Sequence, residues 1–182
     1  MTNENLKKSI RTVLDFPIKG IQFRDITSLL EVPEAFNDAV ISLSHVIGKL
    51  GGADAIVGIE SRGFIFGSPI AWDHNVPFVL ARKPNKLPND TYKKDYELEY
   101  GSATIEIQKN AKLPNTKIVI IDDLIATGGT ALACADLIHE FWKVPKKEIS
   151  IVALIDLPDL KGSTKIRENG YNVETIVEFE GL

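Results

Sequence analysis

Hydrophobic positions along the chain alternate between short apolar runs and segments with helical spacing. Residues 118–121 are all branched and apolar, which is typical of a strand buried on both faces. Residues 33–50 carry apolar side chains near helical spacing, and Gly51 and Gly52 follow, which predicts a helix with a glycine stop. Buried strands that alternate with amphipathic helices along the chain predict an α/β fold with a mostly parallel central sheet flanked by helices.

The same periodicities assign the remaining elements. We expect an N-terminal helix that continues through residues 9–14 and ends at Pro17 and Gly20, and a hairpin arm over residues 98–107. No repeat or linker divides the chain, so residues 1–182 are expected to form a single domain. The other predicted strands are 55–59, 76–81, 117–122, 149–154 and 173–179, and the other predicted helices are 64–74 and 129–142.

The junction after residues 118–121 carries the strongest chemical signal. Asp122 and Asp123 follow the strand, and a loop of small residues, 126–130, comes before the predicted helix. We call residues 126–130 the glycine loop. A strand, a turn with free backbone amides and a helix N-terminus together make an anion-binding site, and paired acids beside it suit hydroxyl groups or a metal. A sugar phosphate offers both an anion and hydroxyl groups.

Other phosphate loops fit this junction poorly. A Walker-type loop needs Gly-Lys-Ser/Thr, but Gly129 is followed directly by Thr130, and the three spaced glycines of a dinucleotide-binding fingerprint are missing. Each half of the motif also has a plainer explanation, because paired acids often end a solvated strand and paired glycines often form a tight turn. The ordered combination favours the sugar-phosphate interpretation.

Two further segments are rich in groups that bind anions. Arg62 lies between small residues at the strand-to-helix junction 58–64, where a guanidinium fork suits phosphate oxygens. Arg82, Lys83 and Lys86 lie in a basic loop, residues 82–88, within a charged stretch that runs to residue 100. A stretch of this length is expected to be a lid or a solvated flexible loop, and a basic lid would shield a diphosphate from water.

Composition and charge narrow the class of protein. The chain has 182 residues, of which 44% are hydrophobic and 25% charged, as in ordinary globular domains. The net charge of -4 argues against a general nucleic-acid binder. Cys134, the single cysteine, is expected to be a small core residue, because no base accompanies it. The polar N-terminus and the absence of a membrane-length apolar run favour a cytoplasmic protein.

The apolar run, the double acid and the glycine loop resemble the motif by which type I phosphoribosyltransferases bind phosphoribosyl diphosphate (PRPP). Additional segments resemble the adenine-specific branch of that family: Phe23-Arg-Asp-Ile-Thr27, Arg82-Lys83 with Lys86-Leu-Pro88, Tyr96-Glu-Leu-Glu-Tyr-Gly101 and Glu106-Ile-Gln-Lys109. The resemblance implies the family's fold, with a small base-binding hood over residues 1–30 and a flexible lid over residues 82–101. It also implies a non-proline cis peptide at Glu60-Ser61 or its neighbour.

The resemblance further implies a purine-salvage reaction, in which PRPP and adenine give AMP and pyrophosphate. Magnesium would accompany the diphosphate through water, with no direct protein ligand, and the enzyme would be a homodimer. The implied roles are Glu99 as the catalytic residue and Tyr100 in the lid; Asp122 and Asp123 at the ribose; Ala126, Thr127, Gly128, Gly129 and Thr130 at the 5'-phosphate; Ser61, Arg62, Arg82, Lys83 and Lys86 at the pyrophosphate; and Gln22, Phe23 and Arg24 at adenine.

Two alternatives stay open on the sequence. A phosphoribosyltransferase for hypoxanthine, guanine or xanthine would share the PRPP motif, although segment 23–27 fits the adenine type better. A PRPP-sensing regulator would also share it, but such proteins usually add a DNA-binding domain, and the residues before Pro17 are too few for one.

Overall fold

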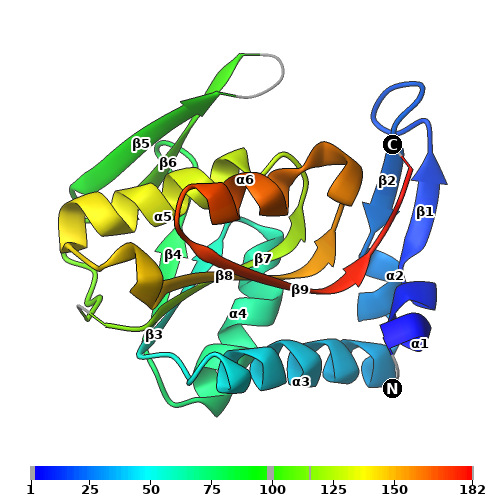
Figure 1. Cartoon of the computed structure of the whole chain (residues 1–182), viewed down its shortest axis with the longest axis horizontal. Helices are drawn as coiled ribbons and strands as arrows, with labels where there is room; N and C mark the ends of the chain where they lie inside the picture. The colour runs from blue at the N-terminus through cyan, green and yellow to red at the C-terminus, as the bar shows by residue number, and fades with distance from the viewer. Residues whose placement is uncertain (1–2, 98–100, 115, 182) are drawn as a thin grey trace.

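A computed structural model describes residues 3–97, 101–114 and 116–181, and its centre is a parallel sheet of five strands (Figure 1). The strand order is β4-β3-β7-β8-β9, and every neighbouring pair is parallel. This confirms the predicted fold class. The strands are β3 (Ala55–Ile59), β4 (Phe78–Ala81), β7 (Ile118–Ile125), β8 (Ile149–Asp156) and β9 (Asn172–Glu178).

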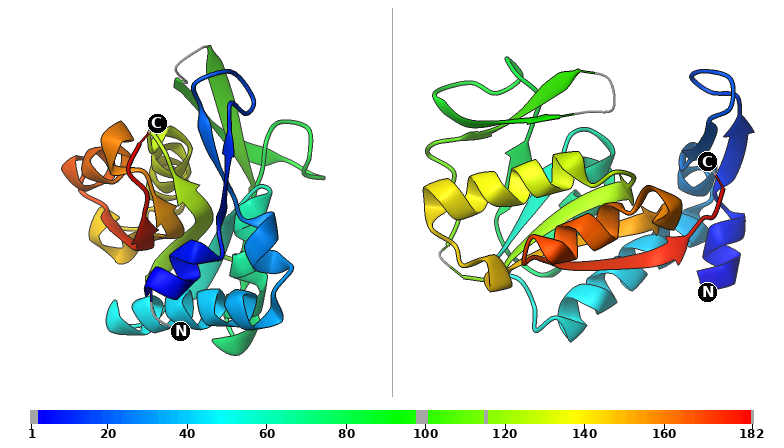
Figure 2. Two further views of the ribbon diagram at one scale, coloured as in Figure 1. Left: turned by 90° about the vertical axis from the view of Figure 1, so that its right-hand side faces the viewer. Right: turned by 45° about the horizontal axis from the view of Figure 1, so that its top comes forward.

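Helices cover both faces of this sheet (Figure 2). The side chains of each strand alternate between the two faces, so apolar side chains on both faces need a layer of helices to bury them. On β7, Ile118 and Ile120 pack with helix α5 (Gly129–Trp142) and helix α6 (Gly162–Glu168). Val119 and Ile121 belong to the opposite cluster, with helix α3 (Pro33–Lys49) and helix α4 (Arg62–Asp73). The central strand is therefore buried on both faces, as its continuous apolar run predicts.

A separate antiparallel pair lies within residues 1–30, the segment predicted to form the hood. Strand β1 (Arg11–Leu14) pairs with β2 (Gln22–Asp25), and we call this pair the hood hairpin. Helices α1 (Asn3–Lys8) and α2 (Thr27–Leu30) flank it in the chain. The predicted continuation of the N-terminal helix through residues 9–14 is therefore wrong: residues 11–14 have a strand partner, and the β-branched Thr12 and Val13 suit that partner.

A second antiparallel pair stands over the carboxyl ends of the sheet strands (Figure 2). It consists of β5 (Thr91–Glu97) and β6 (Ser102–Gln108), and two backbone hydrogen bonds between Arg82 and Glu106 join it to the end of β4. The expectation of a continuous loop from residue 82 to residue 100 is thus wrong for Thr91–Glu97, which pairs fully with β6. The mobility of this lid region stays a prediction.

Smaller differences concern the ends of elements. Strand β7 continues to Ile125, so the two acids lie within it and not after it, because β8 supplies partners as far as Asp156. Helix α6 and two short 3-10 helices, Lys146–Glu148 and Pro158–Leu160, were not predicted. Cys134 is fully buried, and burial raises the pKa of its thiol. Among the described residues, no helix is long and apolar enough to cross a membrane.

Candidate active site

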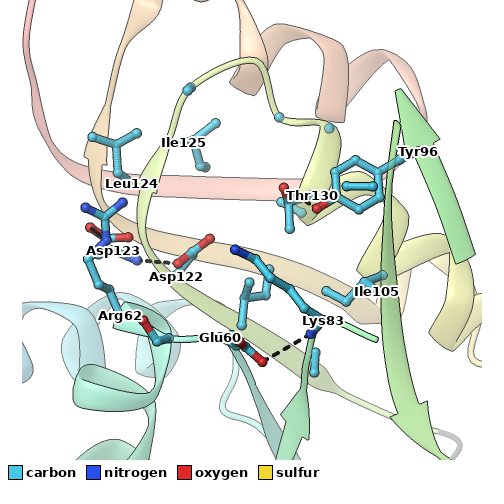
Figure 3. A pocket seen from close by; sticks show the side chains of 18 of the residues that line it. Glu60, Arg62, Lys83, Tyr96, Ile105, Asp122, Asp123, Leu124, Ile125 and Thr130 are labelled. Atoms are coloured by element: carbon cyan, nitrogen blue, oxygen red, sulfur yellow. Dashed lines mark hydrogen bonds and ion pairs between the residues drawn. The ribbon is translucent and has the colours of Figure 1, made fainter. Parts of the chain in front are cut away.

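A polar cavity of about 530 Å³ lies at the carboxyl ends of β3 and β7, beneath the β5–β6 pair (Figure 3). In parallel α/β sheets, ligands bind at this end of the strands. The cavity lining brings together most of the predicted site residues from three separate parts of the chain: Ser61 and Arg62; Arg82 and Lys83; and Asp122, Asp123, Ala126, Thr127, Gly128, Gly129 and Thr130. Its volume suits a small phosphorylated ligand.

The glycine loop connects the end of β7 to the start of helix α5. Gly128 precedes the helix in the left-handed conformation, with φ of 74°. A Cβ atom there would lie 2.8 Å from the backbone oxygen of Gly162, so the loop also needs glycine for space. The loop therefore presents its backbone at a helix N-terminus, which is the arrangement that binds a phosphate.

Gly162 supports the glycine loop from a distant part of the sequence. A Cβ atom on Gly162 would lie 2.2 Å from the carbonyl oxygen of Ala126 and 2.7 Å from the nitrogen of Gly128. The backbone of the turn 157–162 is thus packed directly against the loop, and we call these residues the supporting turn. A Lys-Gly pair is by itself a poor signal, so no role was predicted for Gly162 from the sequence.

The two acids occupy different environments although they are adjacent. Asp122 is partly exposed to the cavity, and its Oδ1 accepts a hydrogen bond of 2.9 Å from the backbone N–H of Asp123. Asp123 is buried, and its Oδ2 lies 2.9 Å from Nε of Arg62. Burial and the charge of Asp123 raise the pKa of Asp122 well above its usual value. Burial also raises the pKa of Asp123, although the Arg62 guanidinium opposes this.

Close backbone packing places Arg62 beside the acids. A Cβ atom on Gly63 would lie 2.4 Å from the carbonyl oxygen of Ile121, so the first turn of α4 rests directly on β7. The peptide Glu60-Ser61 just before this helix is cis, as the family resemblance implies.

Glu60 organises the basic side of the cavity. Its Oε2 accepts hydrogen bonds from Nε of Arg82, at 2.8 Å, and from the backbone N–H of Lys83, at 3.1 Å. Nη1 of Arg82 donates to the carbonyl oxygen of Lys86 at 3.0 Å, which fixes the basic loop. Lys86 itself is exposed and is not among the residues that line the cavity. From the sequence, Glu60 was expected only as part of a cis peptide, with no role in the site.

The predicted adenine-binding residues lie on β2, beside the cavity and outside its lining. The Phe23 ring centroid is 5.5 Å from the guanidinium carbon of Arg62, so the hood contacts the site through this pair. The Arg24 side chain is buried elsewhere and hydrogen-bonds to residues near the C-terminus. Because side chains alternate along a strand, Phe23 and Arg24 project in opposite directions.

Strand β5 contributes Tyr96, which belongs to one of the segments that resemble the family and had no predicted role of its own. Tyr96 lines the cavity, and its hydroxyl accepts a hydrogen bond of 3.1 Å from Oγ1 of Thr130 (Figure 3). Its place on β5 became clear only from the pairing with β6. The predicted catalytic residue Glu99 and the predicted lid residue Tyr100 lie outside the described residues.

Comparisons with known proteins agree with this geometry. The sequence model of the phosphoribosyl transferase domain matches residues 28–180. The adenine phosphoribosyltransferase of Marinobacter nauticus is 45% identical to the chain over 98% of the chain and 97% of the relative. The crystal structure of adenine phosphoribosyltransferase from Thermoanaerobacter pseudethanolicus has a TM-score of 0.88 and 41% identity, covering 98% of this chain and 100% of that chain.

A second similar structure comes from Saccharomyces cerevisiae. It is an adenine phosphoribosyltransferase in complex with an imino-altritol 1,6-bisphosphate and adenine. Its TM-score is 0.85 at 35% identity, covering 96% of this chain and 98% of that chain.

Proposed function

The chain belongs to the adenine phosphoribosyltransferase family, and we propose how its site performs the family reaction, in which PRPP and adenine give AMP and pyrophosphate. One observation carries the proposal. The glycine loop and Asp122 share a single cavity with Arg62, Arg82 and Lys83. PRPP carries a 5'-phosphate and a diphosphate on one ribose. Its site would need an anion-binding group at each end and, between them, groups that accept hydrogen bonds from the ribose hydroxyls.

The glycine loop would bind the 5'-phosphate. Backbone N–H groups at the start of α5 would donate to its oxygens, and the helix dipole would contribute about 0.3–2 kcal/mol. The hydroxyl group of Thr127 would add a further hydrogen bond, and Thr130 would contribute its backbone N–H, because its hydroxyl proton is donated to Tyr96. The Tyr96 hydroxyl accepts a hydrogen bond from Thr130, so its own proton would be available to donate a hydrogen bond to the same phosphate.

The acids would serve the ribose. Asp122 faces the cavity, and its carboxylate would accept hydrogen bonds from the ribose hydroxyls (Figure 3). As the bond from the sugar carbon to pyrophosphate breaks, positive charge develops on the sugar, and a nearby carboxylate stabilises that charge. Asp123 would act at the same place while its contact with Arg62 holds that guanidinium in position.

Ser61, Arg62, Arg82 and Lys83 would bind the pyrophosphate group, with Lys86 at the outer edge of the basic loop. Glu60 supports this side by fixing Arg82 and the backbone of Lys83. The residues present fit a magnesium ion carried by the diphosphate. Among the described residues no three acidic, histidine or cysteine side chains converge into a metal cage, and Asp122 offers a carboxylate to the ion's water ligands. When bound, the ion would neutralise charge on the leaving pyrophosphate.

Adenine would bind between the hood and the ribose site. Phe23 would stack on the purine, and the backbone of Gln22 and Arg24 would recognise its amino edge. The contact between Phe23 and Arg62 supports this placement, because it brings the hood to the ribose site. Glu99 in the lid would exchange a proton with a purine nitrogen, an effect typically worth about 10² to 10⁴ in rate.

We also propose that the enzyme acts in the cytoplasm as a homodimer, as the family resemblance implies. Large apolar side chains on the surface of α3 and α4 support a protein interface: Ile41 is 56% exposed and Trp72 is 84% exposed.

A steady-state assay tests the function. Adenine, hypoxanthine, guanine and xanthine would be offered separately with PRPP and magnesium while pyrophosphate release is followed. We expect pyrophosphate release with adenine and none with the other three bases. Release with an oxo-purine would contradict the base assignment, and PRPP binding without turnover would favour a regulator.

The catalytic role of Glu99 has its own test. Glu99→Ala should lower kcat at least tenfold, because proton transfer to the purine would be lost. The matched control is Glu97→Ala, which removes an exposed acid two positions earlier in the chain, at the end of β5, and should leave kcat within twofold of wild type. Equal kcat values for the two variants would remove Glu99 from the chemistry.

A further inference from the structure

The residues after β9 leave the sheet and lie beside the hood strand β2 (Figure 1). We call residues 179–181 the C-terminal segment. The backbone N–H of Phe179 donates to the carbonyl oxygen of Asp156 at 3.0 Å, which is the last sheet-like contact before the chain turns to the hood. The sequence analysis gave no role to any residue after Leu160.

Arg24 clamps this segment to the hood. Its Nη2 donates to the carbonyl oxygens of Glu180 and Gly181, both at 3.1 Å, and its Nη1 donates to Oγ1 of Thr12 at 2.7 Å. Its guanidinium carbon lies 4.7 Å from the Phe179 ring centroid. Arg24 is 5% exposed, so the cation has exchanged water for these partners. One side chain therefore joins both strands of the hood hairpin to the C-terminal segment.

The other side of the segment is attached to the phosphate end of the site. The backbone N–H of Gly181 donates to Oδ2 of Asp159 at 2.8 Å, and Asp159 belongs to the supporting turn. The backbone N–H of Leu157, in the same turn, donates to the carbonyl oxygen of Ile125 at 3.1 Å. Gly162, the last residue of the turn, packs against the glycine loop.

We propose that the C-terminal segment fixes the base-binding hood relative to the glycine loop, with Arg24 as a positioning residue for adenine. The proposal rests on the proposed function for the identity of the base. A two-stranded hairpin is marginally stable by itself and needs an external attachment to hold one position. Arg24 supplies that attachment directly beside Phe23, whose ring faces Arg62 on the site side.

Loss of the clamp should affect the two substrates differently. The glycine loop and the acids stand on the central sheet, so PRPP binding has its own rigid support. Adenine binding would depend on the position of β2, which the C-terminal segment fixes. Removal of the carbonyl partners would also leave a buried cation unpaired, and the strand would have to shift to hydrate it.

The experiment compares KM for adenine and KM for PRPP in three variants. Arg24→Met keeps the aliphatic bulk and removes the donors, Arg24→Lys keeps the charge, and a chain ending at Phe179 removes both acceptor carbonyls. We expect Arg24→Met and the shortened chain to raise KM for adenine at least tenfold and KM for PRPP less than threefold. Arg24→Lys should be intermediate, because one ammonium cannot span all three acceptors.

The control is Lys7→Met. Lys7 lies on the same Phe179 ring, with Nζ 4.9 Å from the centroid, and is exposed. Both KM values should stay within twofold of wild type. Arg24→Met combined with the shortened chain should be no worse than the worse single variant, because each change already removes the hydrogen bonds between Arg24 and the carbonyl oxygens of Glu180 and Gly181. An equal rise in both KM values, no rise in either, or additive effects would overturn the proposal.

Hydrogen exchange gives a readout that is independent of activity. Amides of β2 should exchange at least tenfold faster in the shortened chain, while amides of β7 exchange as in wild type. If wild type does not use adenine but β2 exchanges faster in the shortened chain, the proposed function fails and the structural attachment is supported. Unchanged exchange at β2 would overturn the attachment whatever the activity.

Discussion

The proposed phosphate side of the cavity and the proposed base-binding hood beside it are built in different ways. On the phosphate side, Asp122 and the glycine loop come from one continuous stretch on β7, a strand in the middle of the sheet and buried on both faces. On the base side, the hood hairpin is a separate two-stranded sheet that reaches the site through Phe23 and is held by residues from the far end of the chain. A short motif can specify the first kind of site, whereas the second depends on contacts between distant segments.

The largest effect is expected from Asp122→Asn, which separates function from stability on the phosphate side. Loss of the carboxylate charge at the ribose should lower kcat/KM about 100-fold. The folded-state pKa of Asp122 is raised above 3.8, so ionisation of this group opposes folding, and its contribution to stability falls as pH rises above that value. The ligand-free variant should therefore melt at a higher temperature than wild type at pH 7, and the difference should disappear below pH 3.8.

Thermal melts at pH 3 and pH 7 beside the kinetic assay test this prediction. Asp73→Asn is the control, because Asp73 is exposed at the end of α4 and should change neither property. A lower melting temperature for Asp122→Asn at pH 7 would show that the ionised carboxylate stabilises the ligand-free fold.

The next largest effect is expected from Gly162→Ala, which tests whether the phosphate side is independent of the rest of the chain. The added methyl group would meet the Ala126 carbonyl oxygen at 2.2 Å, so the glycine loop or the supporting turn must move. We expect KM for PRPP to rise about tenfold and the free energy of unfolding to fall by about 1–3 kcal/mol, as in overpacked sites.

Gly48→Ala is the matched control for this substitution. Gly48 lies within α3 with no atom within 4 Å of the added Cβ, so the change should stabilise the helix by about 0.5–1 kcal/mol and leave KM unchanged. Denaturant unfolding and PRPP kinetics measure both variants. If Gly162→Ala behaves like Gly48→Ala, the glycine loop does not depend on the supporting turn.

The smallest effect is expected from Asp25→Asn at the base of the hood. Hydrogen bonds from the Thr27 hydroxyl, Arg11 and the Thr27 backbone lower the pKa of Asp25 from 3.8 to about 2. A lowered folded-state pKa stabilises the fold above pH 3.8, and this stabilisation is lost as pH falls through about 2. After solvent screening the contribution is about 1 kcal/mol or less, which corresponds to roughly 2–4 °C at pH 7.

The melting temperature of Asp25→Asn relative to wild type should therefore recover as pH falls toward 2. KM for adenine should rise by no more than about threefold, because the Arg24 clamp remains in place. A larger rise would mean that the hood is held mainly at its base, and it would weaken the case for the C-terminal segment.

The strands of the sheet and the proposed phosphate side could be predicted from the sequence, since both depend on local pattern. Continuous apolar runs marked the strands. The acids in β7 and the glycines that follow it are neighbours in the chain, so their proximity needs no long-range contact. The same locality explains why the helix after Gly128 was predicted correctly, whereas the cis peptide at Glu60-Ser61 was implied by the family resemblance.

The tertiary structure decided the rest, because those features depend on partners far away in sequence. Residues 11–14 look helical in isolation and become a strand only by pairing with residues 22–25. Tyr96 reaches Thr130 because β5 pairs with β6 above the cavity, and Gly162 reaches the glycine loop because helix α6 begins there. Arg24 meets Glu180 and Gly181 across 156 and 157 positions, a contact that no local pattern of residues can encode.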